Sequence, residues 1–235
     1  MLGTIVNAVA ILVGGLAGLL LRGGIKQKYQ TIANQAIGLS VLVVGLSGAI
    51  GKIMQPEANP VLFIVSLVLG GLLGELLGIE AGLEKLGNWL QGKIRTKKDT
   101  GNIADGFVAA SLLFCVGTMG IMGALQSGMQ GQHTTLFTKS VLDGITAVIM
   151  ASTMGVGVLF SAVSVFIYQG AITLLAGVIS PLLTADMLRE ILLVGGIMIA
   201  ALGLNILGIT KIKVGNMLPA ILVPVVYYLV LGLFS

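Results

Sequence analysis

The sequence has little charge: only 9% of its 235 residues are Asp, Glu, Lys or Arg, whereas 56% are hydrophobic. A soluble globular domain carries about a quarter of its residues as charged side chains. This scarcity excludes a soluble surface and predicts an integral membrane protein. The formal net charge is +4, but the basic residues lie in short gaps between apolar runs rather than on one face. We therefore expect the lipid bilayer, and no nucleic acid, as a partner.

Cysteine and histidine are almost missing as well. The single cysteine, Cys115, lies inside an apolar run, which excludes an internal disulfide and a cysteine-based metal site. One histidine and a few scattered carboxylates form no acid–base constellation, so we expect no enzyme and no cofactor other than an ion. The start of the chain has no basic leader before its first apolar segment, so we expect that segment to be retained as a span.

Long apolar runs are what the sequence does contain. A helix needs roughly 20 residues to cross a bilayer, and six charge-free stretches of that length lie near residues 4–21, 33–51, 60–78, 105–126, 190–209 and 215–234. The 42 uncharged residues between Asp143 and Asp186 predict two further helices joined by a tight turn around residues 155–160. The alternative for this stretch is one span plus a re-entrant segment. The predicted fold is an all-α integral membrane domain with about eight transmembrane helices.

Lysine and arginine orient these spans, because short cytoplasmic loops carry an excess of both. With eight spans, Lys52, Lys139 and Arg189 lie on one side. The other side collects Arg22, Lys26, Lys28, Lys85, Lys93, Arg95, Lys97, Lys98, Lys211 and Lys213. We expect a protein of the bacterial inner membrane with both termini outside the cytoplasm. A seven-span model would move Lys211 and Lys213 to the wrong face.

The longest polar segment, residues 79–100, has apolar residues at helical spacing and a basic end. It predicts an interfacial helix on the cytoplasmic leaflet, anchored by Trp89 and the lysines of residues 93–98; the alternative is a link that couples two moving halves. We therefore expect a single transmembrane domain, 1–235, with this segment between two sets of spans. Spans 1–3 occupy residues 1–78, spans 4–5 residues 101–160, and spans 6–8 residues 161–235.

Two weak internal matches predict inverted structural repeats. Asp105-Gly106 precedes an apolar stretch that ends in Gly117-Thr118-Met119-Gly120, and Asp143-Gly144 precedes one that ends in Thr153-Met154-Gly155. A second match aligns Gly38, Gly45, Leu46 and Ser47 with Gly196, Gly203, Leu204 and Asn205. The paired spans are an odd number apart, so the partners would cross the membrane in opposite senses.

The Thr-Met-Gly segments are the predicted binding site. Interrupted helices in transporters offer backbone groups near the middle of the membrane, and glycine permits such breaks at residues 117–123 and 152–157. The candidate substrate or ion ligands are Gly117, Thr118, Met119, Gly120, Ser152, Thr153, Met154, Gly155, Ser47 and Asn205. Sodium is the expected ion, at the hydroxyls of Thr118 and Thr153. The alternative is that these are small residues at a packed helix crossing, with each threonine bonded to its own backbone.

Three carboxylates are candidates for gating or coupling. Asp105 and Asp143 each precede a predicted helix, where they would cap it or, in broken helices, attract cations. Glu75 lies within span 3, in a stripe of glycines at positions 70, 74 and 78. Such a stripe is typical of close helix contact, and a homodimer is one contact that it would serve. The polar residues Asn7 and Gln169 are expected to form interhelical hydrogen bonds.

Four segments resemble a known family: Gly3-Thr4-Ile5-Val6-Asn7, the glycine-rich end of span 1, the segment 117–120, and the run from Lys211 to Pro219. The sequence resembles, over essentially its whole length, the bacterial membrane proteins of domain-of-unknown-function family 554, also called YqgA/YdfK-like. The resemblance implies a bacterial inner-membrane protein and leaves the activity open. The repeats and breaks favour a secondary transporter of a small solute or ion, coupled to sodium or protons. The alternatives are an ion channel and a membrane scaffold or sensor.

Overall fold

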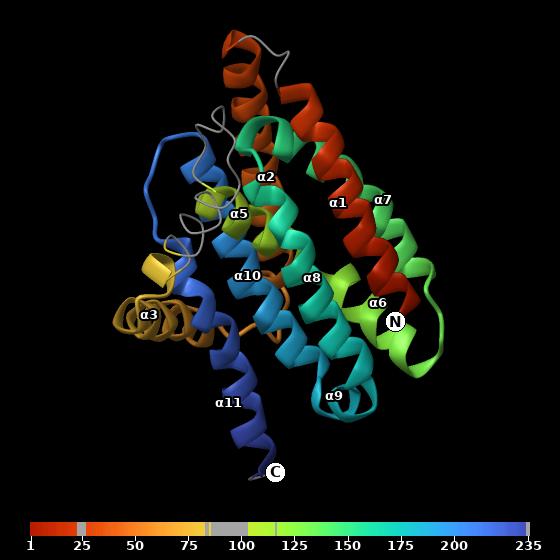
Figure 1. Ribbon diagram of the computed structural model, residues 1–235. Coiled ribbons are helices and arrows are strands. Elements are labelled where there is room, and N and C mark those ends of the chain that lie inside the picture. Colours follow the sequence, from red (N-terminus) through yellow and green to blue (C-terminus); the bar gives the residue numbers. More distant parts are fainter. Residues whose placement is uncertain (23–26, 83–84, 86–102, 116, 234–235) are drawn as a thin grey trace. The chain divides into compact units, whose positions relative to one another are not determined.

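The computed structural model describes residues 1–22, 27–82, 85, 103–115 and 117–233, and in these residues all regular structure is helical. The elements in chain order, shown in Figure 1, are α1 (Leu2–Arg22), α2 (Gln27–Ile53), α3 (Pro60–Leu77), α5 (Ile103–Cys115), α6 (Thr118–Met129), α7 (Thr134–Met154), α8 (Gly157–Leu174), α9 (Ala176–Leu182), α10 (Ala185–Ile206), the 3-10 helix η1 (Val214–Ile221) and α11 (Leu222–Leu233).

The helices confirm the all-α membrane fold. Within the described residues, seven helices are long and apolar enough to cross a bilayer, and the bent pair of α5 and α6 makes up to eight. Each of the six charge-free stretches corresponds to a helix or to a pair of consecutive helices. The predicted interfacial helix over residues 79–100 lies, apart from residues 79–82 and 85, outside the described residues.

The chain forms two compact units, each assembled from separate parts of the sequence. Unit 1 comprises Met1–Ile37 and Leu83–Ile179, and unit 2 comprises Gly38–Gly82 and Ser180–Ser235. Unit 1 therefore holds α1, α5, α6, α7 and α8, whereas unit 2 holds α3, α10, η1, α11 and most of α2. The order of the predicted spans does not show this division, because each unit joins helices that are distant in sequence.

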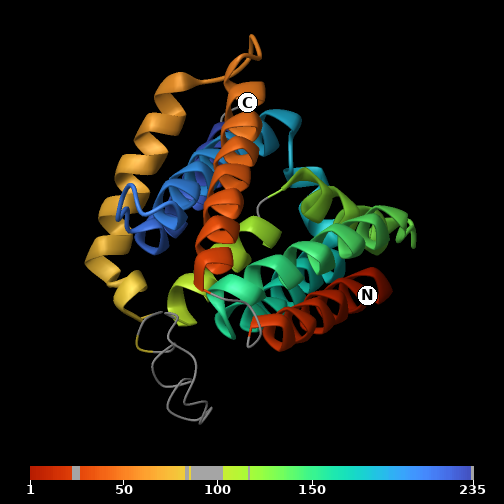
Figure 2. The same ribbon diagram turned by 90° about the horizontal axis from the view of Figure 1, so that it is seen from above.

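Three helices of unit 1 pack side by side along their lengths, as Figures 1 and 2 show for α1, α7 and α8. Two contacts of α1, Gly3 against Leu136 and Gly18 against Val148, show that it runs parallel to α7. Because Gly18 has no side chain, the α7 backbone approaches it closely; a Cβ there would overlap the Val148 carbonyl oxygen. Glycines in α1 are thus packing residues.

Helix α8 returns in the opposite direction after a tight turn. Gly155 follows α7 with φ 84° and ψ −157°, a conformation that side chains with a Cβ rarely adopt, and α8 begins at Gly157. Both α7 and α8 are long enough to span a bilayer. The structure thus favours two full helices over the alternative of a span plus a re-entrant segment.

The bent pair α5 and α6 crosses the whole thickness of unit 1. The two helices are bent by 59° relative to each other, and they follow α8 in parallel from its first turn to its last. Three contacts in chain order mark this path: Gly157 against Ile103, Ser111 with Ser164 at 3.1 Å between their hydroxyl oxygens, and Gly128 against Thr173. The pair is therefore one span interrupted near its middle, and not a re-entrant loop.

Unit 2 is also held by glycines. Gly45 of α2 lies against Gly196 of α10, and Gly38 lies against Leu207, so these two helices run antiparallel. Gly70 and Gly74 of α3 lie against Ala220 and Asn216 of η1, where an added Cβ would overlap backbone atoms. The glycines that the sequence aligned as a repeat are thus partly contact partners of each other; the repeat itself stays a prediction.

Candidate functional site

A cluster of polar side chains is buried among the helices of unit 1. Lys139 and Asp143, one turn apart on α7, form an ion pair with 2.5 Å between Nζ and Oδ2, and both side chains are less than a tenth exposed. Asn7 of α1 donates its amide hydrogens to Asp143 Oδ2 at 3.0 Å and to Gln169 Oε1 of α8 at 3.2 Å. We call these four residues, Asn7, Lys139, Asp143 and Gln169, the polar cluster.

Two threonines continue the polar surface by one turn. Thr4 Oγ1 of α1 lies 3.3 Å from Thr173 Oγ1 of α8, and both residues are buried. Thr4 precedes Asn7 by three residues and Thr173 follows Gln169 by four, so each threonine shares a helix face with a member of the polar cluster. The hydroxyls therefore extend the cluster towards the start of α1.

The polar cluster borders the interruption between α5 and α6. On the α5 side, Lys139 Nζ lies 6.0 Å from the ring centroid of Phe114. On the α6 side, a Cβ added to Gly120 would lie 3.4 Å from Lys139 Cε and 3.7 Å from Gln169 Nε2. The ion pair and the helix break thus belong to one place in the structure, although about 20 residues separate them in sequence.

Two amide atoms in the polar cluster have no hydrogen-bond partner among the residues that the structure describes. Asn7 Oδ1 is an acceptor and Gln169 Nε2 is a donor, and both residues are completely buried. A buried amide group without a partner costs about 1–3 kcal/mol, and such groups are rare in native structures. The cluster therefore presents one free acceptor and one free donor beside a charged pair, which is the chemistry of a site for a small polar ligand.

The depth of the cluster also suits a binding site. Asp143 is nine residues into α7, so it lies about 13 Å along the helix from its start, since each residue adds about 1.5 Å. The hydrocarbon core is about 30 Å thick. A charge at this depth is expensive unless it is paired, and ionisable residues inside spans commonly mark ion or substrate pathways.

The predicted pair of Thr-Met-Gly breaks is corrected in part. Gly117 has extended backbone (φ −179°, ψ 147°) between α5 and α6, as expected for an interruption, and Gly120 borders the polar cluster. Residues 152–157 instead comprise the end of α7, the turn at 155–156 and the first residue of α8, Gly157, which lies against Ile103 at the start of α5. The 13 residues of α5, about 20 Å of helix, separate the two segments, so they do not meet.

The side chains of the second segment are used locally. Thr153 donates its hydroxyl to the carbonyls of Ile149 and Met150, at 3.3 and 3.0 Å, and Ser152 donates to Ile149 at 2.7 Å. This is the packing alternative that the sequence left open. Met154 and Gly155 belong to the same turn, and Met119 is 37% exposed on α6. The side chain of Thr118 lies outside the described residues.

Asp143 is the clearest correction to the sequence-based assignment. It was expected to precede a helix, and Lys139 to lie in a loop, whereas α7 begins at Thr134 and carries both inside a span. The search for charge-free stretches placed the start of this span too late, because it assigned Lys139 and Asp143 to positions outside the membrane. Asp105 was also expected to precede its helix, but α5 begins at Ile103 and Asp105 lies in its first turn; its role in capping or gating stays a prediction.

The other candidates lie in unit 2, away from any interruption of this kind. Ser47 is exposed on α2, and Asn205 Oδ1 accepts from Thr210 Oγ1 at 2.8 Å and from the Ile212 backbone at 2.9 Å. Glu75 accepts from Lys213 Nζ and Asn216 Nδ2, each at 2.6 Å, and is more than half exposed. Asn205 thus holds the loop before η1, and Glu75 holds the start of η1.

The glycine stripe of α3 is also explained within the chain. Gly70 and Gly74 are covered by η1, and Gly78 ends α3 with φ 61°. The close helix contact that the stripe predicts is therefore confirmed, but its partner is η1 of the same chain. The stripe no longer supports the predicted homodimer.

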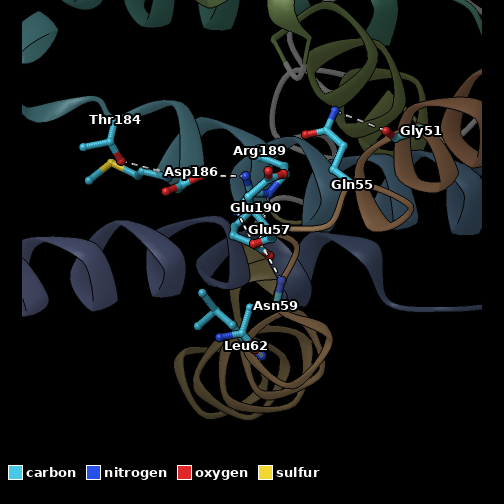
Figure 3. A network of polar contacts seen from close by, with 10 residues as sticks. Gly51, Gln55, Glu57, Asn59, Leu62, Thr184, Asp186, Arg189 and Glu190 are labelled. Carbon is cyan, nitrogen blue, oxygen red and sulfur yellow. Dashed lines mark hydrogen bonds and ion pairs between the residues drawn. The ribbon is translucent and has the colours of Figure 1, made fainter.

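Unit 2 contains a second buried charged group, shown in Figure 3 at the start of α10. Arg189 donates from Nη1 to Asp186 Oδ1 at 2.6 Å and from Nη2 to the Glu57 carbonyl oxygen. Glu190 is completely buried, and its Oε1 accepts from the Asn59 backbone N–H at 3.0 Å. These bonds fasten the α2–α3 loop to α10, so we assign the group a structural role.

The sequence did contain a signal for the polar cluster. Lys139 and Asp143 are four residues apart, which places opposite charges on one helix face, and the segment from Leu136 to Val148 is otherwise largely apolar. An isolated Lys–Asp pair at this spacing in an apolar run indicates a paired charge inside a span. Their link to Asn7 and Gln169 required the tertiary structure.

Comparisons with known proteins agree with this membrane architecture. The family model described as "Protein of unknown function (DUF554)" matches residues 2–229. The "Uncharacterized membrane protein YdfK" of Bacillus subtilis is 41% identical over 235 residues, which are 100% of this chain and 99% of that protein. The "Uncharacterized protein YqgA" of Escherichia coli is 33% identical over 224 residues, 94% of this chain and 93% of that protein. No solved structure matches the chain. The chain belongs to the DUF554 family and is a multi-pass membrane protein.

Proposed function

We propose that this protein is a secondary transporter of a small solute or ion, with its binding site at the polar cluster of unit 1. One observation carries the proposal: the Lys139–Asp143 ion pair is buried inside a span and borders an interrupted helix. Ionisable residues are retained within spans chiefly where function uses them, and interrupted helices recur at transporter sites.

The interruption also supplies a way to move. At Gly117 the backbone is extended, so α6 does not continue α5 as one regular helix. The two half-helices can tilt separately, and each would open the polar cluster towards one side of the membrane. Such alternating access requires that the charged pair is never open to both sides at the same time, and in this structure both of its side chains are buried.

We propose further that the protein lies in the bacterial inner membrane with both termini outside the cytoplasm. Arg22 ends α1 at the same end of unit 1 as the α7–α8 turn, because Gly18 lies against Val148. Under the positive-inside rule this end faces the cytoplasm. The other end of unit 1 then carries the 130–133 loop and the end of α8 outside.

The test is transport by purified full-length protein in proteoliposomes on a solid-supported membrane. Concentration jumps of NaCl, KCl, protons and a panel of amino acids and small carboxylates are expected to give at least one saturable transient current. Asp143→Asn is expected to abolish that current, and the control Ser47→Ala, an exposed position on α2, to keep it. Unitary current steps in planar bilayers would show a channel instead, and no current with any probe would count against transport.

A further inference from the structure

The free acceptor in the polar cluster points to the kind of ligand. Asn7 Oδ1 is completely buried and has no partner, and it belongs to the same amide group that donates to Asp143 Oδ2 at 3.0 Å. Gln169 Oε1 lies 3.2 Å from Asn7 Nδ2. In this arrangement the Asn7 amide nitrogen lies against both the Asp143 carboxylate and Gln169 Oε1, and a half-turn of the Asn7 amide would bring its Oδ1 to them instead. One carboxylate and two amide oxygens from three helices would then face one another, and hard cations prefer oxygen ligands of this kind.

The structure also shows what balances the carboxylate. The Lys139 ammonium lies 2.5 Å from Asp143 Oδ2, so a lysine of the protein neutralises the single carboxylate of the polar cluster. Lys139 Cε lies beside Gly120, 3.4 Å from the position of an added Cβ, and the lysine side chain has several rotatable bonds. The ammonium can therefore leave Asp143 while its backbone stays in place.

The charge of the cluster selects among cations. Among the described residues, no group of three or more His, Cys, Asp or Glu side chains is placed to hold a metal ion. Divalent cations are usually held by several carboxylates. A single carboxylate with neutral oxygens matches one positive charge, as in the pair with Lys139.

We propose that Asn7, Asp143 and Gln169 form a binding site for sodium, which would bind without its water shell. When no sodium is bound, the Lys139 ammonium occupies the position of the ion beside Asp143. The inference rests on the proposed function in that it names the coupling or transported ion of the same site. It moves the sodium site predicted at Thr118 and Thr153 to residues of α1, α7 and α8 beside the interruption between α5 and α6. Thr4 and Thr173 supply hydroxyl oxygens one turn away.

The first experiment removes the competing ammonium. In Lys139→Gln, NaCl compared with choline chloride at equal ionic strength is expected to raise the melting temperature, followed by circular dichroism at 222 nm, by about 5–10 °C when sodium is about a hundredfold above its Kd. Half of the effect should appear at a sodium concentration at least about tenfold lower than in the unmodified protein, because a tethered competitor is gone. Lys213→Gln is the matched control, since it removes a lysine from an exposed ion pair with Glu75.

The second experiment does not depend on the stability of that variant. Binding of ²²Na⁺ to the unmodified full-length protein is measured by scintillation proximity, with Asp143→Asn and Asn7→Leu as test variants. The site is supported if the unmodified protein or Lys139→Gln binds sodium and the substitution Asp143→Asn abolishes this binding. Absence of sodium binding in both proteins, or binding that survives Asp143→Asn, overturns it.

The two proposals fail separately. Saturable flux of another probe in sodium-free proteoliposomes, without ²²Na⁺ binding, would keep the transporter and refute the sodium site. Specific sodium binding without flux of any probe would keep the site and refute transport.

Discussion

The Lys139–Asp143 pair makes a strong prediction about stability. At 2.5 Å, two opposite charges attract by about 7 kcal/mol at an effective dielectric constant of about 20, but burial of both offsets much of this. What remains measurable is the cost of leaving one charge alone, about 3–5 kcal/mol for a buried pair. Lys139→Met and Asp143→Leu are each expected to lower the stability by that amount, which corresponds to a melting temperature lower by about 10 °C.

The double variant Lys139→Met/Asp143→Leu separates charge burial from general damage. It removes both charges and keeps side-chain volume, so most of the stability is expected to return; the loss of the Asn7 hydrogen bond to Asp143 leaves a deficit of about 1 kcal/mol. Thermal unfolding in detergent, followed by circular dichroism at 222 nm, measures the three variants. Lys213→Met is the control: it removes one partner of the exposed ion pair with Glu75 and leaves the Glu75–Asn216 hydrogen bond, so it should change little.

The reasoning would be refuted by additive losses. If the double variant is as unstable as the two single losses together, the residues stabilise the fold independently and no buried pair exists. If both single variants keep the unmodified melting temperature, the cluster is open to water and the assignment of a buried site is wrong. Transport lost in the double variant, with stability restored, would show that the pair is kept for function.

Three further predictions test the packing and the orientation. Gly74→Ala is expected to cost about 1–3 kcal/mol by overpacking α3 against η1, because its Cβ would overlap Asn216, whereas Gly71→Ala, with nothing within 4 Å, should leave the melting temperature unchanged or slightly higher. Gly128→Ala should lower the melting temperature similarly, since its Cβ would overlap the Thr173 carbonyl oxygen; an unchanged value would contradict the path of α6 along α8. In a Cys115→Ser background, a membrane-impermeant maleimide applied to intact cells should label Gln132→Cys and not Lys28→Cys, and the reverse pattern would invert the proposed orientation.

The sequence by itself determined the class of protein and most of its helices. A membrane span is recognised from one segment alone, by its lack of charge and by its length compared with the thickness of the bilayer. Residues 60–78 therefore predict α3 almost residue by residue. The glycine-rich segment 117–123 likewise predicted the break near Gly117, because the tendency of glycine to interrupt a helix also belongs to a single segment. Glycine at 70 and 74 likewise indicated a close contact, although not with which helix.

Only the tertiary structure decided where the charges lie and which helices share a unit. A lysine and an aspartate end a span when each is considered alone, but paired within α7 and bonded to Asn7 they are accommodated inside it. The bond from Asn7 to Asp143 joins residues more than a hundred positions apart in the sequence. The approach of Gly120 to Gln169 joins α6 to α8, with the whole of α7 between them in the sequence. Local patterns report what a segment can tolerate, whereas the neutralisation of a buried charge depends on the helices packed around it.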